Sequence, residues 1–106
     1  MPKATCAFEA RQLTDIPNIG KSIAVDLEGI GIRHPGQLVG LNPYALYARI
    51  ERESGVRHDP CLCDTFIAAV RFMEGAPALP WWRYTAERKN YFSDSRALAR
   101  PAPRKG

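Results

Sequence analysis

The sequence has no long apolar run and few cysteines. No run approaches the roughly 18 apolar residues that a membrane-spanning helix needs. The first residues, Met-Pro-Lys-Ala-Thr-Cys, contain no apolar stretch either, so we expect no signal peptide. Three cysteines are an odd number, which argues against a disulfide framework and favours reduced thiols. We therefore expect a cytoplasmic protein with no membrane contact.

Common catalytic and metal-binding patterns are also absent. There is no nucleophile-elbow glycine pattern, no phosphate loop with its Lys-Ser pair, and no cluster of carboxylates with a histidine. On a helix, Cys61 and Cys63 would point about 200° apart and so cannot share one metal ion. We expect no enzyme, no cofactor and no metal site. At a helix start, Cys61 is either a reactive thiol with a lowered pKa or a small buried hydrophobe, and the second is favoured.

Positive charge is concentrated near the C-terminus. Of the net charge of +4, residues 83–106 carry seven basic and two acidic side chains, or +5. Residues 1–82 are left with a net charge of −1. Any electrostatic attraction to nucleic acid must therefore come mainly from the C-terminal segment.

Helix-start signals predict an all-α protein of five or six short helices. Asn42-Pro43 and Asp59-Pro60 each combine an N-cap side chain with proline at the first helical position. They predict helices over about 43–54 and 60–75. Weaker helical patterns cover the ranges 5–14, 21–28, 34–40 and 80–91. We predict one domain over residues 5–91 and a flexible, disordered basic tail over residues 92–106.

The helix predicted over 60–75 is the most apolar and is expected to form the centre of the core. Asp64 and Arg71 fall on its opposite, outward side. Its apolar residues share one broad face: Leu62, Phe66, Ala69, Val70 and Met73.

Residues 16–21, Ile-Pro-Asn-Ile-Gly-Lys, predict a tight hairpin that leads straight into a helix. Pro17 pre-sets φ at the second position of a type II turn, and Asn18 tolerates the positive φ of the third. Gly20 removes a Cβ where the backbone turns again or comes close to a partner. The free N–H groups at the start of the next helix then point outward, where they suit an anion.

With its flanks, this stretch resembles a helix-hairpin-helix motif: Leu13-x-x-Ile16-Pro17-Asn18-Ile19-Gly20-x-x-x-Ala24-x-x-Leu27-x-x-Ile30-Gly31-Ile32. The run from about residue 7 to residue 89 resembles the bacterial pathogenicity-locus proteins, some of which are named mitomycin-resistance proteins. Besides the hairpin, Asp26-Leu27, Asp59-Pro60-Cys61 and Trp81-Trp82 carry this resemblance. It implies a SAM-like helix-hairpin-helix domain and, as a family capability, DNA binding without sequence specificity. Asn18 departs from the motif, which prefers glycine there.

Double-stranded DNA is the partner we expect, with an accessory role in repair or recombination. Backbone N–H groups of the hairpin would face a phosphate, with Lys21 as a counter-charge and Ser22 as a further donor. The candidate contacts are Pro17, Asn18, Ile19, Gly20, Lys21 and Ser22 in the hairpin and Arg96, Arg100, Arg104 and Lys105 in the tail. Alternatively, the hairpin only joins core helices and the tail only aids solubility. The alternative function is a protein-interaction adaptor with the same fold, which would use the aromatic C-terminal segment as its contact surface.

Aromatic residues interleaved with Arg83, Arg88 and Lys89 follow Pro80. They suit either a stacking strip for single-stranded nucleic acid or, as we favour, a cover for the open end of a small core. The aromatic residues are Trp81, Trp82, Tyr84, Tyr91 and Phe92.

Overall fold

The computed structural model describes residues 3–99, which form an all-helical protein without strands. In place of the five or six short helices predicted, these residues form four α-helices and four 3-10 turns. The elements are η1 (Ala7–Glu9), η2 (Leu13–Asp15), α1 (Lys21–Gly29), η3 (Pro35–Leu38), α2 (Pro43–Ser54), α3 (Pro60–Met73), η4 (Trp81–Tyr84) and α4 (Thr85–Ala99). None of the helices in this range is long and apolar enough to cross a membrane.

The predicted helix starts at Asn42 and Asp59 are confirmed. The Asn42 side chain accepts hydrogen bonds from the N–H groups of Tyr44 and Ala45, and Asp59 accepts one from Cys61. Each cap satisfies amides that have no partner inside the helix. Pro43 and Pro60, at the first helical position, have a φ angle already fixed near the helical value.

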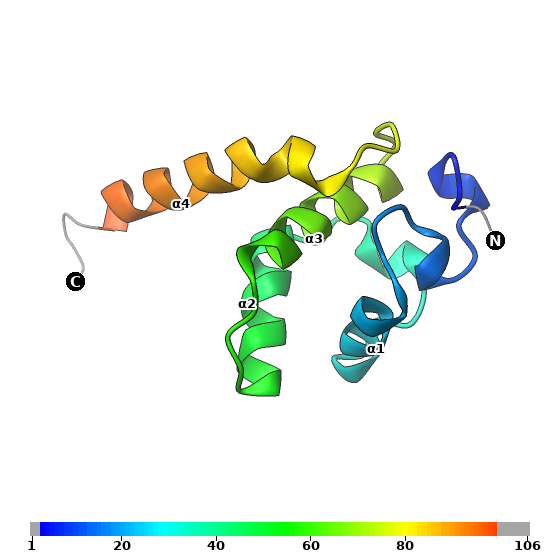
Figure 1. Ribbon diagram of the computed structural model, residues 1–106, viewed down its shortest axis with the longest axis horizontal. Helices are drawn as coiled ribbons and strands as arrows, with labels where there is room; N and C mark the ends of the chain where they lie inside the picture. The colour runs from blue at the N-terminus through cyan, green and yellow to red at the C-terminus, as the bar shows by residue number, and fades with distance from the viewer. Residues whose placement is uncertain (1–2, 100–106) are drawn as a thin grey trace.

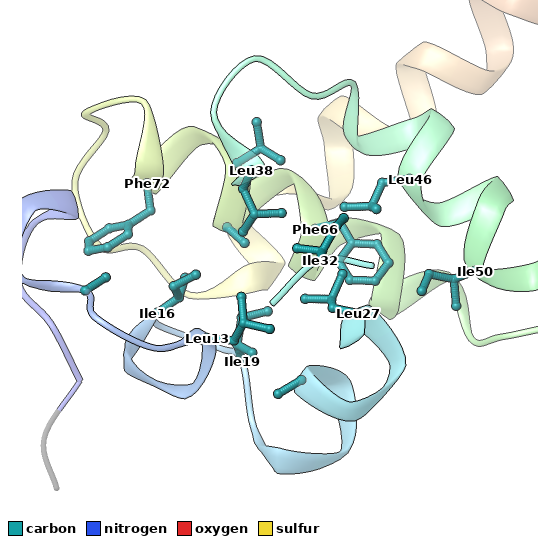
Figure 2. Packing of buried hydrophobic residues seen from close by; sticks show 14 of the residues in the cluster. Leu13, Ile16, Ile19, Leu27, Ile32, Leu38, Leu46, Ile50, Phe66 and Phe72 are labelled. Atoms are coloured by element: carbon teal, nitrogen blue, oxygen red, sulfur yellow. The ribbon is translucent and has the colours of Figure 1, made fainter. Parts of the chain in front are cut away.

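Helix α3 is the centre of the structure and is covered by the elements around it (Figure 1). Its residues 63–70 are all buried. Phe66 and Phe72 extend from it into opposite ends of the main core, Phe66 beside Leu27 of α1 and Phe72 nearer to Ile16 (Figure 2). A helix buried on most of its circumference lets this short chain bury enough apolar surface to fold.

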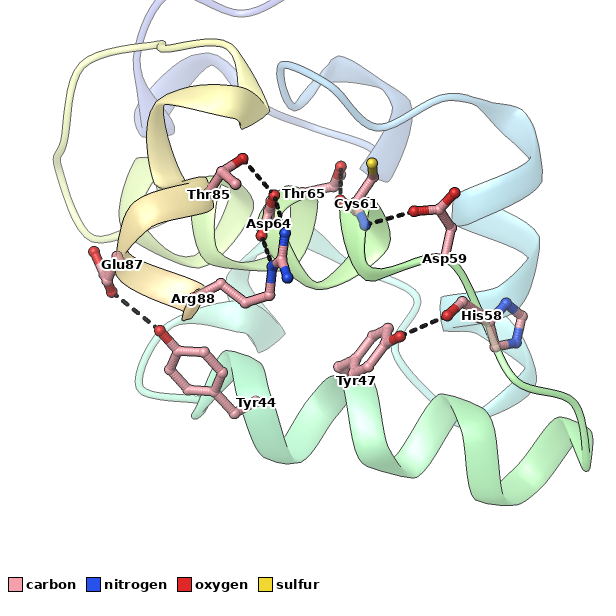
Figure 3. A network of polar contacts seen from close by, with 10 residues as sticks. All are labelled: Tyr44, Tyr47, His58, Asp59, Cys61, Asp64, Thr65, Thr85, Glu87 and Arg88. Carbon is pink, nitrogen blue, oxygen red and sulfur yellow. Dashed lines mark hydrogen bonds and ion pairs between the residues drawn. The ribbon is translucent and has the colours of Figure 1, made fainter. Parts of the chain in front are cut away.

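Asp64 does not face solvent, as its place opposite the apolar face of α3 had predicted. It is completely buried, and its carboxylate accepts hydrogen bonds from Thr85 Oγ1 and Arg88 Nε, both at 2.7 Å (Figure 3). On the same side, Arg71 forms an ion pair with Glu87. The prediction failed because η4 and α4 pack over this side of α3 and bring partners for both charged residues.

The N-terminal helix predicted over residues 5–14 is absent; η1 and η2 take its place. The Glu9 carboxylate accepts hydrogen bonds from the Thr5 N–H and hydroxyl, and Asp15 accepts from the N–H groups of Arg11 and Gln12. Such local bonds compete with the helical pattern. In this arrangement Phe8 is 96% exposed.

Helix α4 continues to Ala99, well beyond the predicted end near Tyr91. Residues 92–99, assigned to the disordered tail, are therefore helical. They contain Ala97, Leu98 and Ala99, which favour a helix, and no glycine or proline occurs before Pro101. In Figure 1, α4 extends beyond the other helices.

The buried ion pair gives the first testable prediction. Replacing Arg88 with Met leaves the Asp64 carboxylate buried with only the Thr85 hydroxyl, so we expect a loss of about 3 kcal/mol in the free energy of unfolding. The double variant Asp64→Leu/Arg88→Met removes both charges and should recover most of this loss. Urea denaturation followed by circular dichroism measures both. Equal losses for the single and double variants would contradict a role for charge compensation.

Candidate nucleic-acid interface

Residues 16–21 form the predicted turn. The Ile19 N–H donates to the Ile16 carbonyl oxygen at 3.1 Å, and Asn18 has a φ of 75°. Positive φ at the third position, after proline, is the signature of a type II turn. Ile16 and Ile19 are fully buried in the main core (Figure 2). The hairpin is therefore held at both ends of the turn by apolar packing.

Asn18 has a second role that the sequence did not indicate. Its side-chain Nδ2 donates to the carbonyl oxygen of Leu79 at 2.9 Å. Leu79 lies 61 residues further along the chain, in the connection between α3 and η4. Where the motif prefers glycine, asparagine thus adopts the left-handed conformation and also ties the hairpin to this connection. No local pattern could have revealed this contact.

The N-terminus of α1 is open. Its N-cap, Gly20, has no side chain to cap the helix, and the first turn contains no acidic residue. The N–H groups of this turn therefore have no acceptor within the helix. A Cβ at Gly20 would meet nothing within 4 Å, and its φ of −94° is open to any residue. Neither the backbone nor the packing of this chain requires glycine there.

Lys3 adds a positive charge beside the hairpin that no sequence pattern indicates. Its ammonium donates to the carbonyl oxygens of Thr14 at 2.6 Å and Ile19 at 2.5 Å. Lys3, Gly20 and Lys21 line a surface groove of about 450 Å³ together with Asp15. Backbone hydrogen bonds from Arg11 and Gln12 lower the pKa of Asp15, so the groove holds one carboxylate and two ammonium groups.

The predicted hairpin contacts lie together but are not equally accessible. Gly20, Lys21 and Ser22 are exposed, whereas Pro17 and Asn18 are half-buried and the Ile19 side chain is buried. Ile19 can therefore offer only its backbone to a ligand.

The predicted tail contacts are described only in part. Arg96 lies on α4. Arg100, Arg104 and Lys105 lie outside the described residues. Their role in binding stays a prediction.

The aromatic segment is divided between the core and the surface. Tyr84 is buried, and Tyr91 stacks on Tyr44 with ring centroids 3.6 Å apart and planes at 2°. Phe92 packs edge-on against Tyr44 at 5.8 Å. Tyr91 and Phe92 pack on Tyr44 but stay 38% and 37% exposed, so of these three residues Tyr84 best fits the favoured interpretation of a cover. Trp82 does not, because it is 60% exposed.

Cys61 does not have the lowered pKa of a reactive thiol. Its hydrogen bond to Asp59, partial burial and the negative charges of Asp59 and Asp64 raise the pKa of the Cys61 thiol. The side chain is half-buried, between the two alternatives that the sequence allowed. Burial raises the pKa of Cys63 to about 12. Within residues 3–99, no group of three His, Cys, Asp or Glu side chains is placed to hold a metal ion.

The Asn18 contact predicts an effect on stability. In Asn18→Ala, a residue that disfavours positive φ replaces one that tolerates it, and the bond to Leu79 is lost. We expect the free energy of unfolding to fall by about 2 kcal/mol. Asn18→Gly loses the bond but removes the conformational strain, so its loss should stay below about 1 kcal/mol. Urea titrations measure the free energy of unfolding of both variants. Equal losses in Asn18→Ala and Asn18→Gly would show that the positive φ of residue 18 does not matter for stability.

The environment of Cys61 predicts its reactivity. In native protein near pH 7.5, exposed Cys6 should react first with a thiol reagent, Cys61 slowly and buried Cys63 hardly at all. Asp59→Asn keeps an N-cap but removes the negative charge that raises the pKa of Cys61. Labelling of Cys61 should therefore become faster, as measured by mass spectrometry of peptides over time. An unchanged rate in Asp59→Asn would contradict control by Asp59.

Comparison with known proteins identifies the family. The model of the pathogenicity locus family matches residues 7–90. Mitomycin resistance protein McrB of Streptomyces lavendulae is 47% identical over 81 residues, which cover 76% of this chain and 77% of that protein. No solved structure shows a significant match. The chain belongs to the pathogenicity locus family, as the residues around the hairpin had indicated.

Proposed function

We propose that this chain is a SAM-like helix-hairpin-helix protein that binds duplex DNA without sequence specificity. The observation that carries the proposal is the open N-terminus of α1, which is presented by a rigid turn and has unobstructed space above Gly20. Helix N-termini of this kind suit phosphate groups, because N–H donors and the helix dipole both favour an anion. Contacts to phosphate oxygens carry no sequence information, so the binding tolerates any sequence.

The contacts divide by chemistry. Backbone N–H groups of the first turn of α1 donate to a phosphate oxygen, and the Ser22 hydroxyl is a further donor. Lys21 and Lys3, which line the groove together with Gly20, supply positive charge. Pro17 and Ile19 act through the turn that they help to form rather than through their side chains. The absence of a Cβ at Gly20 lets the phosphate approach the backbone.

Hairpin contacts alone give weak binding, because residues 1–82 carry a net charge of −1. The C-terminal segment supplies the remaining attraction in this proposal. Its charge of +5 over residues 83–106 would neutralise further phosphates along the same duplex. Arg96, Arg100, Arg104 and Lys105 are the residues assigned to these contacts.

An accessory role in DNA repair or recombination is part of the proposal. The relative in Streptomyces lavendulae is named for mitomycin resistance, and we include resistance of this kind among the effects of DNA binding. A cytoplasmic location also belongs to the proposal. It is supported by the free thiols of Cys6, Cys61 and Cys63.

A protein-interaction adaptor with the same fold is the second candidate. The exposed apolar side chains favour it: Phe8 is 96% and Val25 is 63% exposed. Such side chains suit a protein partner better than a phosphate backbone. This function predicts no salt-dependent affinity for duplex DNA, so the two candidates are separated by one measurement.

Gly20 and Gly29 provide a matched pair of variants. Both glycines leave open space for a Cβ and have no positive φ, but they stand at opposite ends of α1. Gly20→Ala should lose about 1 kcal/mol of stability at most, because alanine is a poorer N-cap than glycine. It should weaken binding to a generic duplex several-fold, because its methyl group obstructs the phosphate. Gly29→Ala should gain up to about 1 kcal/mol in stability from helix propensity and keep its affinity. Fluorescence anisotropy at low salt and thermal unfolding measure the two quantities.

A salt titration completes this experiment. The logarithm of the affinity should fall linearly with the logarithm of salt concentration, by about 0.9 for each phosphate neutralised. Lys21→Glu should reduce both the affinity and the slope. Absence of binding at low salt would rule out the proposed function and leave the adaptor. If Gly20→Ala and Gly29→Ala bound the duplex with equal affinity, the hairpin would not be part of the DNA interface.

A further inference from the structure

Trp82 is a large aromatic side chain held at the surface in a defined orientation. It is 60% exposed. Its indole packs edge-to-face against that of Trp81, with ring centroids 5.7 Å apart and planes at 86°. Trp81 is half-buried and so fixes the pair to the body of the protein. An indole that stays in water does not contribute the stabilisation that its burial would give. Trp82 therefore adds little to the hydrophobic core.

The position of Trp82 links it to the hairpin. The hydrogen bond from Asn18 to the Leu79 carbonyl fixes the connection between α3 and η4 against the turn. Trp82 follows Leu79 by three residues, which span at most about 10 Å. Figure 1 shows this connection passing the hairpin before it enters η4 and α4. Trp82 therefore begins within three residues of the segment that the hairpin holds.

The charges around Trp82 indicate the chemistry of its partner. Arg83 is exposed beside it, and Lys89 is exposed further along α4. Neither forms an ion pair within the part of the chain that the structure describes. Trp82 lies in η4, directly before α4, and positions 86, 89 and 93 lie on one side of α4; all four are exposed. Glu87, the acidic residue of the first turn of α4, points to Arg71 and Tyr44 instead.

We propose that Trp82 stacks on an unpaired nucleobase next to the duplex held by the hairpin, while Arg83 and Lys89 contact the phosphates of the same strand. An aromatic face flanked by cations is the arrangement that binds single-stranded nucleic acid, since every base has a face on which to stack. The preferred substrate is then duplex DNA with a single-stranded extension. This inference rests on the proposed function and adds a preference of DNA structure to it.

Anisotropy titrations of the full chain test the preference. The probes are a blunt duplex and the same duplex with a short thymidine extension on either its 3′ or its 5′ strand. One extension should raise the affinity by about five-fold or more, the lower range of one base–aromatic stack. Trp82→Ala should abolish this gain and leave the affinity for the blunt duplex nearly unchanged. Trp82→Phe should retain most of the gain, because a smaller ring still stacks.

Phe8→Ala is the matched control, since Phe8 is also an exposed aromatic residue but belongs to η1. It should keep the full gain from the extension, and an equal loss in Phe8→Ala and Trp82→Ala would overturn the inference. Equal affinities of the native chain for blunt and extended duplexes would also overturn it, would leave the proposed function intact, and would favour a protein as the partner of Trp82. Absence of binding to every probe would overturn both proposals.

Discussion

The structure depends on the burial of α3 on nearly every side. A chain of this length has room for one such helix, and the other elements pack around it. Complete burial would be impossible for Asp64 without compensation, because an unpaired carboxylate in the interior is unstable. Arg88 and Thr85 provide that compensation from α4 (Figure 3). The ion pair therefore fixes the first turns of α4 against α3, together with the Arg71–Glu87 pair.

The hairpin owes its shape to the same packing. Ile16 and Ile19 anchor the turn in the core formed around Phe66 and Phe72 of α3. Asn18 then fastens the turn to the connection that leaves the C-terminal end of α3. Because the turn is held by buried side chains and by this bond, the first turn of α1 keeps a fixed direction. Rigidity of this kind favours binding, since little conformational entropy is lost when a partner docks.

Local signals in the sequence were sufficient for the parts of the fold that depend on neighbouring residues. The caps at Asn42 and Asp59 and the positive φ of Asn18 were all predicted, because each follows from residue types within a few positions. The environment of Asp64 was not, because helical periodicity shows which face is apolar but not how many elements cover a helix. The same limit applies to the Asn18–Leu79 contact and to Lys3, whose partners are distant in sequence. The N-terminal helix failed for a local reason, since Asp15 and Glu9 bond to nearby N–H groups instead of leaving them to a helix.

The distribution of charge explains why one hairpin is not a sufficient interface. The groove beside Gly20 has two ammonium groups and one carboxylate, so its own attraction for a phosphate is small. Useful affinity then requires several contacts along one strand, each of which adds little alone. Helix α4 is suited to supply them, because its 15 residues extend for about 22 Å from a base fixed by the Asp64–Arg88 pair. Lys89 and Arg96 follow one another at two helical turns on this rod. Under the proposed function, the buried ion pair fixes the direction of α4, and exposed Lys89 on this helix is placed to contact a phosphate.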